Sequence, residues 1–358
     1  MRKTAITLLL LLTLVKFLAA QKDIAIGKSF TMHSSVLSEE REYFVSLPAD
    51  YDDSKYAPAR YPVIYVLDGE LGFQYAVGMQ QHLSRGPYAN TPRSIIVGIV
   101  NTQRTRDLTP ALPPSDTVSG KLFGTGGGNE AFIQFMVKEL MPAIDSNFRT
   151  SGYNVLAGHS FGGLTATNIL LHHTALFNAY IIIDPSLWWG QQMLLAQAEQ
   201  ILKTKDFAST SVFVAQANHE ADAKNTPTDM QIPTRKFADL LGNLQPKGLR
   251  HRYQYYPNED HGTIPIPAVY DGLRFLFDGH LVPVRPAIAK PEMVTQQFEK
   301  LSKQLGFRFQ PSEHWLHWMG NFALSNKNKN AAIAFYKMAI KLYPQSENVK
   351  RMLQTVEN

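Results

Sequence analysis

Short apolar runs alternate along this chain with longer stretches in which apolar residues recur every three to four positions. The runs at 61–67 and 94–100 are almost entirely apolar, as is typical of strands buried on both faces. The pattern predicts further strands at 41–47, 153–157, 179–183, 211–215 and 252–256. It predicts helices at 129–148, 161–172, 189–203 and 230–241. Strands that alternate with helices predict an α/β fold, with a mostly parallel sheet covered on both faces.

The pattern changes after residue 282, where prolines at 283, 286 and 291 resemble a linker. Beyond them the sequence predicts only helices, at 292–305, 312–325, 329–342 and 346–356. Two of these fit one tetratricopeptide-like hairpin, and an ordinary helical cap is the alternative. The small, aromatic and helix-ending positions of that repeat match Gly320, Ala332, Tyr336, Ala339 and Pro344. One repeat cannot bury its own apolar face, so we expect region 283–358 to pack on the preceding domain, 21–282, or on a protein partner.

The first 20 residues have the order of a secretory signal: a basic head, an apolar run over 5–15 and small residues at 18–20. The run is shorter than the about 20 apolar residues that span a bilayer, so we expect cleavage after Ala20 and no stable membrane insertion. The expected location is the periplasm or the outside of a bacterial cell. An uncleaved anchor is the alternative.

The composition of the chain excludes several kinds of binding site and catalytic group. Removal of Arg2, Lys3 and Lys16 with the signal lowers the formal charge from +5 to +2, which gives no general attraction for nucleic acid. The absence of cysteine excludes disulfides, thiolate metal sites and a cysteine nucleophile. No His/Asp/Glu spacing indicates a metal site, and the chemistry considered below needs no cofactor.

The strongest motif is Gly158-His159-Ser160-Phe161-Gly162, which lies between a predicted strand and a predicted helix. G-x-S-x-G in that context predicts a nucleophile elbow, in which the serine stands on a tight turn and the glycines leave room for neighbouring backbone. Ser160 is therefore the candidate nucleophile. We expect His159 to be a packing residue.

A serine hydroxyl needs a base, and in this type of fold the base follows the last strand. His261 follows the strand predicted at 252–256 and is the candidate. The orienting acid should follow the strand at 211–215, which favours Glu220, with Asp222 as the alternative. Asp184, at the end of the preceding strand, and a dyad without an acid remain open.

The developing oxyanion should be bound by backbone N–H groups. One belongs to Phe161, the residue after the nucleophile, and the other to Gly69 or Glu70, in the loop after an early strand. Trp188 and Trp189 follow a strand end and are candidates for a substrate pocket, with core packing as the alternative.

Two arginines, Arg104 and Arg106, lie in a loop expected at the same edge of the sheet. They are candidates to bind an anionic or catecholate substrate. The alternative is an ion pair with Asp107 or other loop charges.

These motifs together resemble the esterase family that includes the enterochelin (siderophore) esterases and S-formylglutathione hydrolase. The matching segments are 61–69, 104–110, 158–163, 184–189 and 259–262. The resemblance implies the α/β-hydrolase fold and carboxylic-ester hydrolysis, with Ser160 and His261 in the catalytic places. Many relatives read Ser-Pro-Ser where this chain has Asp184-Pro185-Ser186.

The sequence therefore predicts a serine ester hydrolase that acts on a small-molecule ester through an acyl-enzyme intermediate. One alternative is hydrolysis of siderophore lactones by the same groups. Another is an inactive hydrolase fold that binds a partner through its helical tail.

Overall fold

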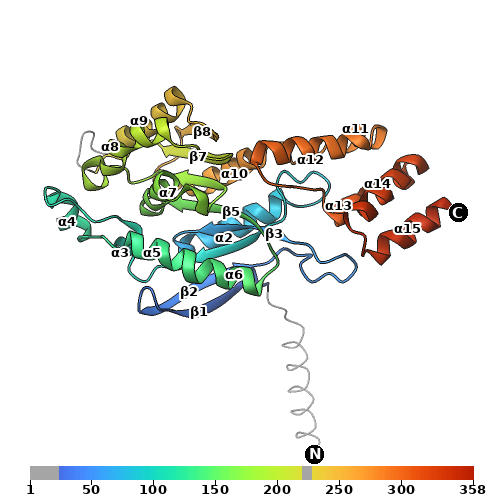
Figure 1. The fold of residues 1–358 in the computed structure, drawn as a ribbon, viewed down its shortest axis with the longest axis horizontal. Coiled ribbons are helices and arrows are strands. Elements are labelled where there is room, and N and C mark those ends of the chain that lie inside the picture. The colour runs from blue at the N-terminus through green and yellow to red at the C-terminus, as the bar shows by residue number, and fades with distance from the viewer. Residues whose placement is uncertain (1–23, 220–227) are drawn as a thin grey trace, which may run out of the picture.

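The computed structural model describes residues 24–219 and 228–358 (Figure 1). Its centre is one eight-stranded sheet with the order β1-β2-β4-β3-β5-β6-β7-β8. β1 pairs antiparallel with β2, and β2 pairs antiparallel with β4, while all the other pairs are parallel. The strands are β1 Lys28–Ser34, β2 Glu39–Ser46, β3 Tyr61–Val66, β4 Ile95–Ile99, β5 Thr150–His159, β6 Ala179–Ile183, β7 Thr210–Ala217 and β8 Leu249–Tyr256.

Alternate residues of each central strand enter different apolar clusters, one on each face of the sheet. In β3, Ile64 and Val66 pack in one cluster, and Val63 and Tyr65 pack in the other. Every residue of β3 is buried, which explains why its sequence is apolar throughout instead of alternating with polar residues. The predicted α/β fold, a mostly parallel sheet covered by helices, is confirmed.

Helices cover both faces of the sheet (Figure 1). Residues of α2 and α10 belong to the first cluster, and residues of α5, α7, α8 and α9 belong to the second. The helices are α2 Gly69–Leu83, α3 Arg104–Leu108, α4 Thr117–Phe123, α5 Asn129–Phe135, η1 Met136–Leu140, α6 Met141–Asn147, α7 Phe161–His172, η2 Thr174–Leu176, α8 Trp189–Thr204, α9 Gln231–Leu244 and α10 Pro265–Leu276.

Some elements depart from the sequence pattern. The helix predicted at 129–148 contains a π-helical turn, η1, between α5 and α6. The first turn of α8 is distorted, since Gly190, Gln191 and Gln192 all have left-handed backbone angles. Strand β1 and the helices α2, α3 and α4 were not predicted, and the segment expected to be a linker contains the short helix α11, Val284–Ala289. α3 and α4 are too short to show a clear apolar period.

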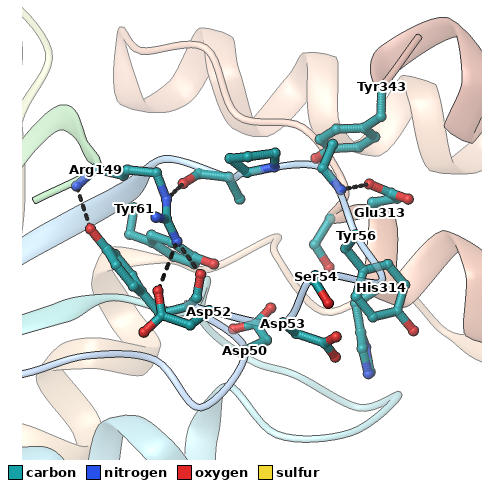
Figure 2. A pocket seen from close by; sticks show the side chains of 15 residues that line it. Asp50, Asp52, Asp53, Ser54, Tyr56, Tyr61, Arg149, Glu313, His314 and Tyr343 are labelled. Atoms are coloured by element: carbon teal, nitrogen blue, oxygen red, sulfur yellow. Dashed lines mark hydrogen bonds and ion pairs between the residues drawn. The ribbon is translucent and has the colours of Figure 1, made fainter. Parts of the chain in front are cut away.

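The C-terminal region is entirely helical and continues the cluster on the α10 face of the sheet. Its helices are α11 Val284–Ala289, α12 Glu292–Leu305, α13 Glu313–Ser325, α14 Lys329–Leu342 and α15 Glu347–Glu357. Glu313, which is 3% exposed, ties this region to the loop before β3, because its carboxylate accepts the backbone N–H of Ala57 at 2.8 Å (Figure 2). The region thus packs on the α/β part. The tetratricopeptide likeness and the boundary at 283 stay predictions.

Candidate active site

The turn between β5 and α7 holds Ser160 in a strained conformation. Its backbone angles are φ 60° and ψ −118°, which are rare for a residue with a side chain. The turn closes only because Gly158 has no side chain: a Cβ there would lie 2.2 Å from the carbonyl oxygen of Gly162. A Cβ on Gly163 would likewise lie 2.9 Å from the Cα of Pro185. The predicted elbow geometry is therefore present at the end of β5.

His261 follows β8 and reaches back to the end of β6. Its Nδ1 lies 2.6 Å from Oδ2 of Asp184, with the ring donating to the carboxylate. Asp184 is fully buried, whereas the side chain of His261 is 40% exposed. A buried acceptor on Nδ1 leaves Nε2 as the nitrogen available for proton transfer.

Asp184 has further partners besides His261. Nε2 of His219 lies 2.9 Å from the same carboxylate oxygen, and the backbone N–H of Ala217 donates to the other oxygen at 3.1 Å. Burial acts to raise the pKa of Asp184, but the hydrogen bonds from His219 and His261 outweigh it, so its pKa is lowered below the usual range. The carboxylate is therefore charged at neutral pH.

The residue before the nucleophile packs against the candidate base. The rings of His159 and His261 have centroids 4.3 Å apart, so His261 lies beside the elbow. Burial, with a smaller effect of His261, lowers the pKa of His159 to about 4, and its Nε2 has no hydrogen-bond partner in the described part of the chain. The neutral ring fits the packing role expected for it. Oγ of Ser160 lies 3.4 Å from Oγ of Ser186.

His159, Asp184 and His261 each offer one ligand atom within 4.8 Å of the others. The hydrogen bond between His261 and Asp184 already occupies two of these groups. The arrangement is that of a hydrogen-bonded acid–base pair, and the expectation of no metal site stays a prediction.

The expected oxyanion donors lie at two neighbouring helix starts. Phe161 is the first residue of α7, and Gly69 and Glu70 are the first two residues of α2. Backbone N–H groups in the first turn of a helix have no partner within the helix. The two starts pack together, since a Cβ on Gly162 would lie 3.3 Å from a carboxylate oxygen of Asp68.

Comparison with known proteins identifies the family. The family described as "Putative esterase" matches residues 34–263. The chain belongs to this esterase family. It is 27% identical over 265 residues to the ferri-bacillibactin esterase BesA of Bacillus subtilis (strain 168), a match that covers 70% of this chain and 89% of the relative.

Two further relatives widen the comparison. A siderophore triacetylfusarinine C esterase of Aspergillus fumigatus is 26% identical over 263 residues, covering 65% of this chain and 87% of the relative. The crystal structure of an IroE-like serine hydrolase from Shewanella oneidensis is 34% identical, with a TM-score of 0.80, and covers 88% of this chain and 99% of that one. The family and these relatives show that the chain is an enzyme that hydrolyses esters. The expected resemblance is confirmed.

An aromatic cluster borders the elbow of this esterase. Phe161 contacts the rings of Trp188 and Trp189, with centroids 6.0 Å and 5.3 Å away. Trp189 is fully buried and donates to the carbonyl of Pro110, so its surroundings are those of a core residue. Trp188 is 6% exposed and contacts Phe123 of α4, which is 39% exposed. The exposed edge of the cluster therefore lies at Trp188 and Phe123, and Phe123 had no signal in the sequence beyond its apolarity.

The two arginines that the sequence placed in a loop belong to the short helix α3, and their surroundings differ. Arg106 forms hydrogen bonds to the carboxylates of Asp107 and Glu39, at 2.6 Å each, as part of an ion-pair network that joins α3 to β2. Arg104 binds both carboxylate oxygens of Asp68 and lies over the ring of Phe161, 5.2 Å from its centroid. Its side chain is 35% exposed. The geometry therefore favours Arg104 over Arg106 as the cation nearest the site.

Glu220 and Asp222, the acids favoured by the sequence, lie outside the described residues. The partner that the structure gives to His261 is Asp184, which the sequence had left as a third option.

Proposed function

We propose that this esterase uses Ser160, His261 and Asp184 as its catalytic triad. The observation that carries the proposal is the 2.6 Å hydrogen bond between Nδ1 of His261 and the buried carboxylate of Asp184. β5 and β6 are adjacent and parallel, so Ser160 and Asp184 follow neighbouring strand ends at one edge of the sheet. Asp184 follows β6, whereas the acid expected from the sequence, Glu220, would follow β7.

The proposed reaction has two steps. Nε2 of His261 accepts the hydroxyl proton of Ser160 while Oγ attacks the ester carbonyl, and His261 then returns the proton to the leaving alkoxide. In the second step, His261 takes a proton from water, the resulting hydroxide attacks the acyl-enzyme, and Ser160 is released with its proton restored. The charged Asp184 holds the ring orientation and stabilises the imidazolium in both steps.

Backbone donors stabilise the oxyanion in this proposal. The N–H of Phe161 points from the start of α7, and the second donor is the N–H of Gly69 or Glu70 at the start of α2. Loss of one such donor in related chemistry costs about 10²–10³ in kcat. No cofactor takes part.

The substrate class proposed is an ester that carries an aromatic or an anionic group. Phe123 and Trp188 offer an apolar surface beside Phe161, and Arg104 offers a partly exposed cation. The names of the curated relatives, a ferri-bacillibactin esterase and a triacetylfusarinine C esterase, favour a siderophore ester within this class.

Two measurements test the triad. A fluorophosphonate probe should label the wild-type protein and leave the Ser160→Ala variant unlabelled, and the same variant should lose at least about 10⁴ of kcat/KM on any ester that the enzyme accepts. Labelling of Ser160→Ala at the wild-type rate would place the nucleophile elsewhere. A panel of ferric siderophores and simple aryl esters then ranks substrates by kcat/KM.

We further propose that the protein is exported and that residues 1–20, which lie outside the described residues, are removed. No helix in the described ranges has the length and apolarity needed to span a bilayer. N-terminal sequencing of protein recovered from the bacterial periplasm or medium should begin at Gln21. The division into 21–282 and 283–358, the tetratricopeptide likeness of the tail and its binding of a protein partner belong to the same proposal. Affinity capture with and without residues 283–358 tests the last of these.

A further inference from the structure

A cavity of about 650 Å³ lies where the helical region meets the α/β part. It is bordered by the start of β3, by the loop between α2 and β4, and by α12, α13 and α14. The smaller cavity in Figure 2, of about 230 Å³, shares Asp50, Tyr61, His314 and Tyr343 with it. Ligand cavities of 300–1,000 Å³ are common at such junctions.

This cavity is far from the nucleophile. Tyr61 begins β3, whereas Ser160 follows the end of β5, and these two strands are parallel neighbours. The six residues of β3 span about 20 Å, so the cavity and the candidate active site lie at opposite edges of the sheet.

The charged residues that line the cavity favour an anion. They are three arginines, Arg60, Arg93 and Arg308, and one acid, Asp50. Asp50 is already paired with Arg93. Among the described residues, the guanidinium of Arg60 has one hydrogen bond, to the carbonyl of Thr150 at 3.1 Å, and Arg308 has no ion pair. Two positive charges therefore remain unpaired in the lining of this cavity, whereas the acids Asp52, Asp53 and Glu313 line the smaller one.

A buried hydroxyl adds an unused polar group to the lining. Thr91 is 1% exposed, and its Oγ1 has no hydrogen-bond partner among residues 24–219 and 228–358. An unpaired buried hydroxyl is destabilising, and a ligand oxygen in the cavity that accepts its hydrogen bond removes that cost. His280, also in the lining, donates to the carbonyl of Ala89, and burial lowers its pKa to about 4, so it is neutral and adds no charge.

The remaining walls are rich in aromatic rings. They include Phe298 of α12, Phe307 and Phe309 in the loop after it, Trp315 of α13 and Tyr343 after α14. Rings in such a wall favour a flat apolar body, because edge-to-face and offset contacts add to the burial of apolar area.

From these features we propose that the cavity binds an aromatic carboxylate. Its ring lies against the aromatic wall, its carboxylate faces Arg60 and Arg308, and one oxygen accepts the hydroxyl of Thr91. The site is separate from the catalytic one, so the proposal stands or falls independently of the triad. An aromatic carboxylate of this kind can be the acid released when an aromatic ester is hydrolysed, or it can come from another source.

Calorimetric titration with 2-naphthoate tests the proposal, using full-length protein whose nucleophile has been blocked by diisopropyl fluorophosphate. We expect one saturable site, and binding of 2-naphthylmethanol, the uncharged analogue, should be weaker by about tenfold because it lacks the charge-assisted hydrogen bonds. The affinity for 2-naphthoate should also fall as salt is raised. Equal affinity for the two compounds, or no saturation by either, would overturn the proposal.

Variants locate the site. Arg308→Gln and Arg60→Gln change exposed residues and should each weaken 2-naphthoate binding by about fivefold or more, a loss of about 1 kcal/mol. Arg274→Gln, an exposed arginine of α10 outside the lining, is the matched control and should bind as the wild type does. Thr91→Val tests the hydroxyl, and its melting temperature shows whether the variant is folded. Unchanged affinity in both cavity arginine variants would contradict the site, even if 2-naphthoate binds elsewhere.

Discussion

The catalytic edge of the sheet and the helical region differ in their backbone conformations. At the carboxyl ends of β3, β5 and β6, the residues Asp68, Ser160 and Asp184 all have positive φ, at 54°, 60° and 41°. None is a glycine, so each conformation costs of order 1–3 kcal/mol. All three belong to the candidate active site or its immediate support.

The helical region keeps its positive φ angles in turns between helices, at Gly306 and Lys327. Its helices instead begin with side chains that accept the first free N–H groups: Ser312 for α13, Asn328 for α14 and Ser346 for α15. Each such cap is worth about 1 kcal/mol. Three non-glycine residues with positive φ thus lie at the catalytic edge, whereas the helical region has one, Lys327, and gains local stabilisation from its three caps.

The largest expected effect falls on the catalytic edge. Asp184→Asn should lower kcat/KM by about 10⁴, because an amide in this place does not hold the required tautomer of the base or stabilise its charged form. Glu220→Gln is the matched comparison and should change kcat/KM by less than about tenfold, because Asp184 already occupies Nδ1 of His261. Steady-state kinetics on one ester decide between them, and a reversed order of the two losses would restore Glu220 as the acid.

A substitution in the helical region should instead affect stability. A Cβ on Gly320 of α13 would lie 2.2 Å from the buried ring of Tyr336, so Gly320→Ala should lower the free energy of unfolding by about 1–3 kcal/mol. Gly242→Ala in α9 meets nothing within 4 Å and should gain up to about 1 kcal/mol from helix propensity. Urea unfolding measures both. Equal effects would mean that α13 and α14 do not pack as described.

Two histidines have strongly lowered pKa values, His159 beside the elbow and His280 in the lining of the cavity at the opposite edge of the sheet. Burial brings the pKa of His159 and that of His280 to about 4, whereas an unfolded histidine has a pKa near 6.5. Between these values the unfolded chain binds the proton and the folded chain does not, so stability falls as the pH falls.

For His280 this loss amounts to about 2 kcal/mol between pH 7 and pH 5. His280→Asn places an amide N–H where Nδ1 donates to the carbonyl of Ala89 but does not titrate, so its unfolding free energy should depend less on pH by that amount. Parallel slopes for wild type and variant would show that His280 is not shielded from solvent.

The smallest expected effect concerns selectivity at the catalytic edge. Phe123→Ser removes the exposed ring that contacts Phe161 and Trp188, and should lower kcat/KM for an aryl-carboxylate ester by about tenfold relative to an acetate ester. Val118→Ser, on the same helix and similarly exposed, is the control. A uniform loss on both esters would mean that α4 supports the site without contacting substrate.

Much of the catalytic edge was readable in the sequence because it depends on local geometry. The glycines at 158, 162 and 163 and the strand and helix around them indicate one turn and hence Ser160. His261 followed from its place after the last strand. The partner of His261 was not readable in the same way, because a carboxylate reaches a histidine 77 residues away only through the spatial order of strands. Short helices such as α4 were not predicted for a different reason. Its seven residues form barely two turns, which is too short for an apolar period to be recognised.

The buried carboxylate of Glu313 has a practical consequence for building chimeras. It accepts hydrogen bonds both from the backbone of Ala57, in the loop before β3, and from the hydroxyl of Ser346 at the start of α15. A C-terminal segment grafted from a relative would therefore need to arrive together with the 48–60 loop of that same relative. If the C-terminal segment were transplanted alone, the backbone N–H in the 48–60 loop could lose its acceptor. Equally, the carboxylate in the segment could lose one of its donors.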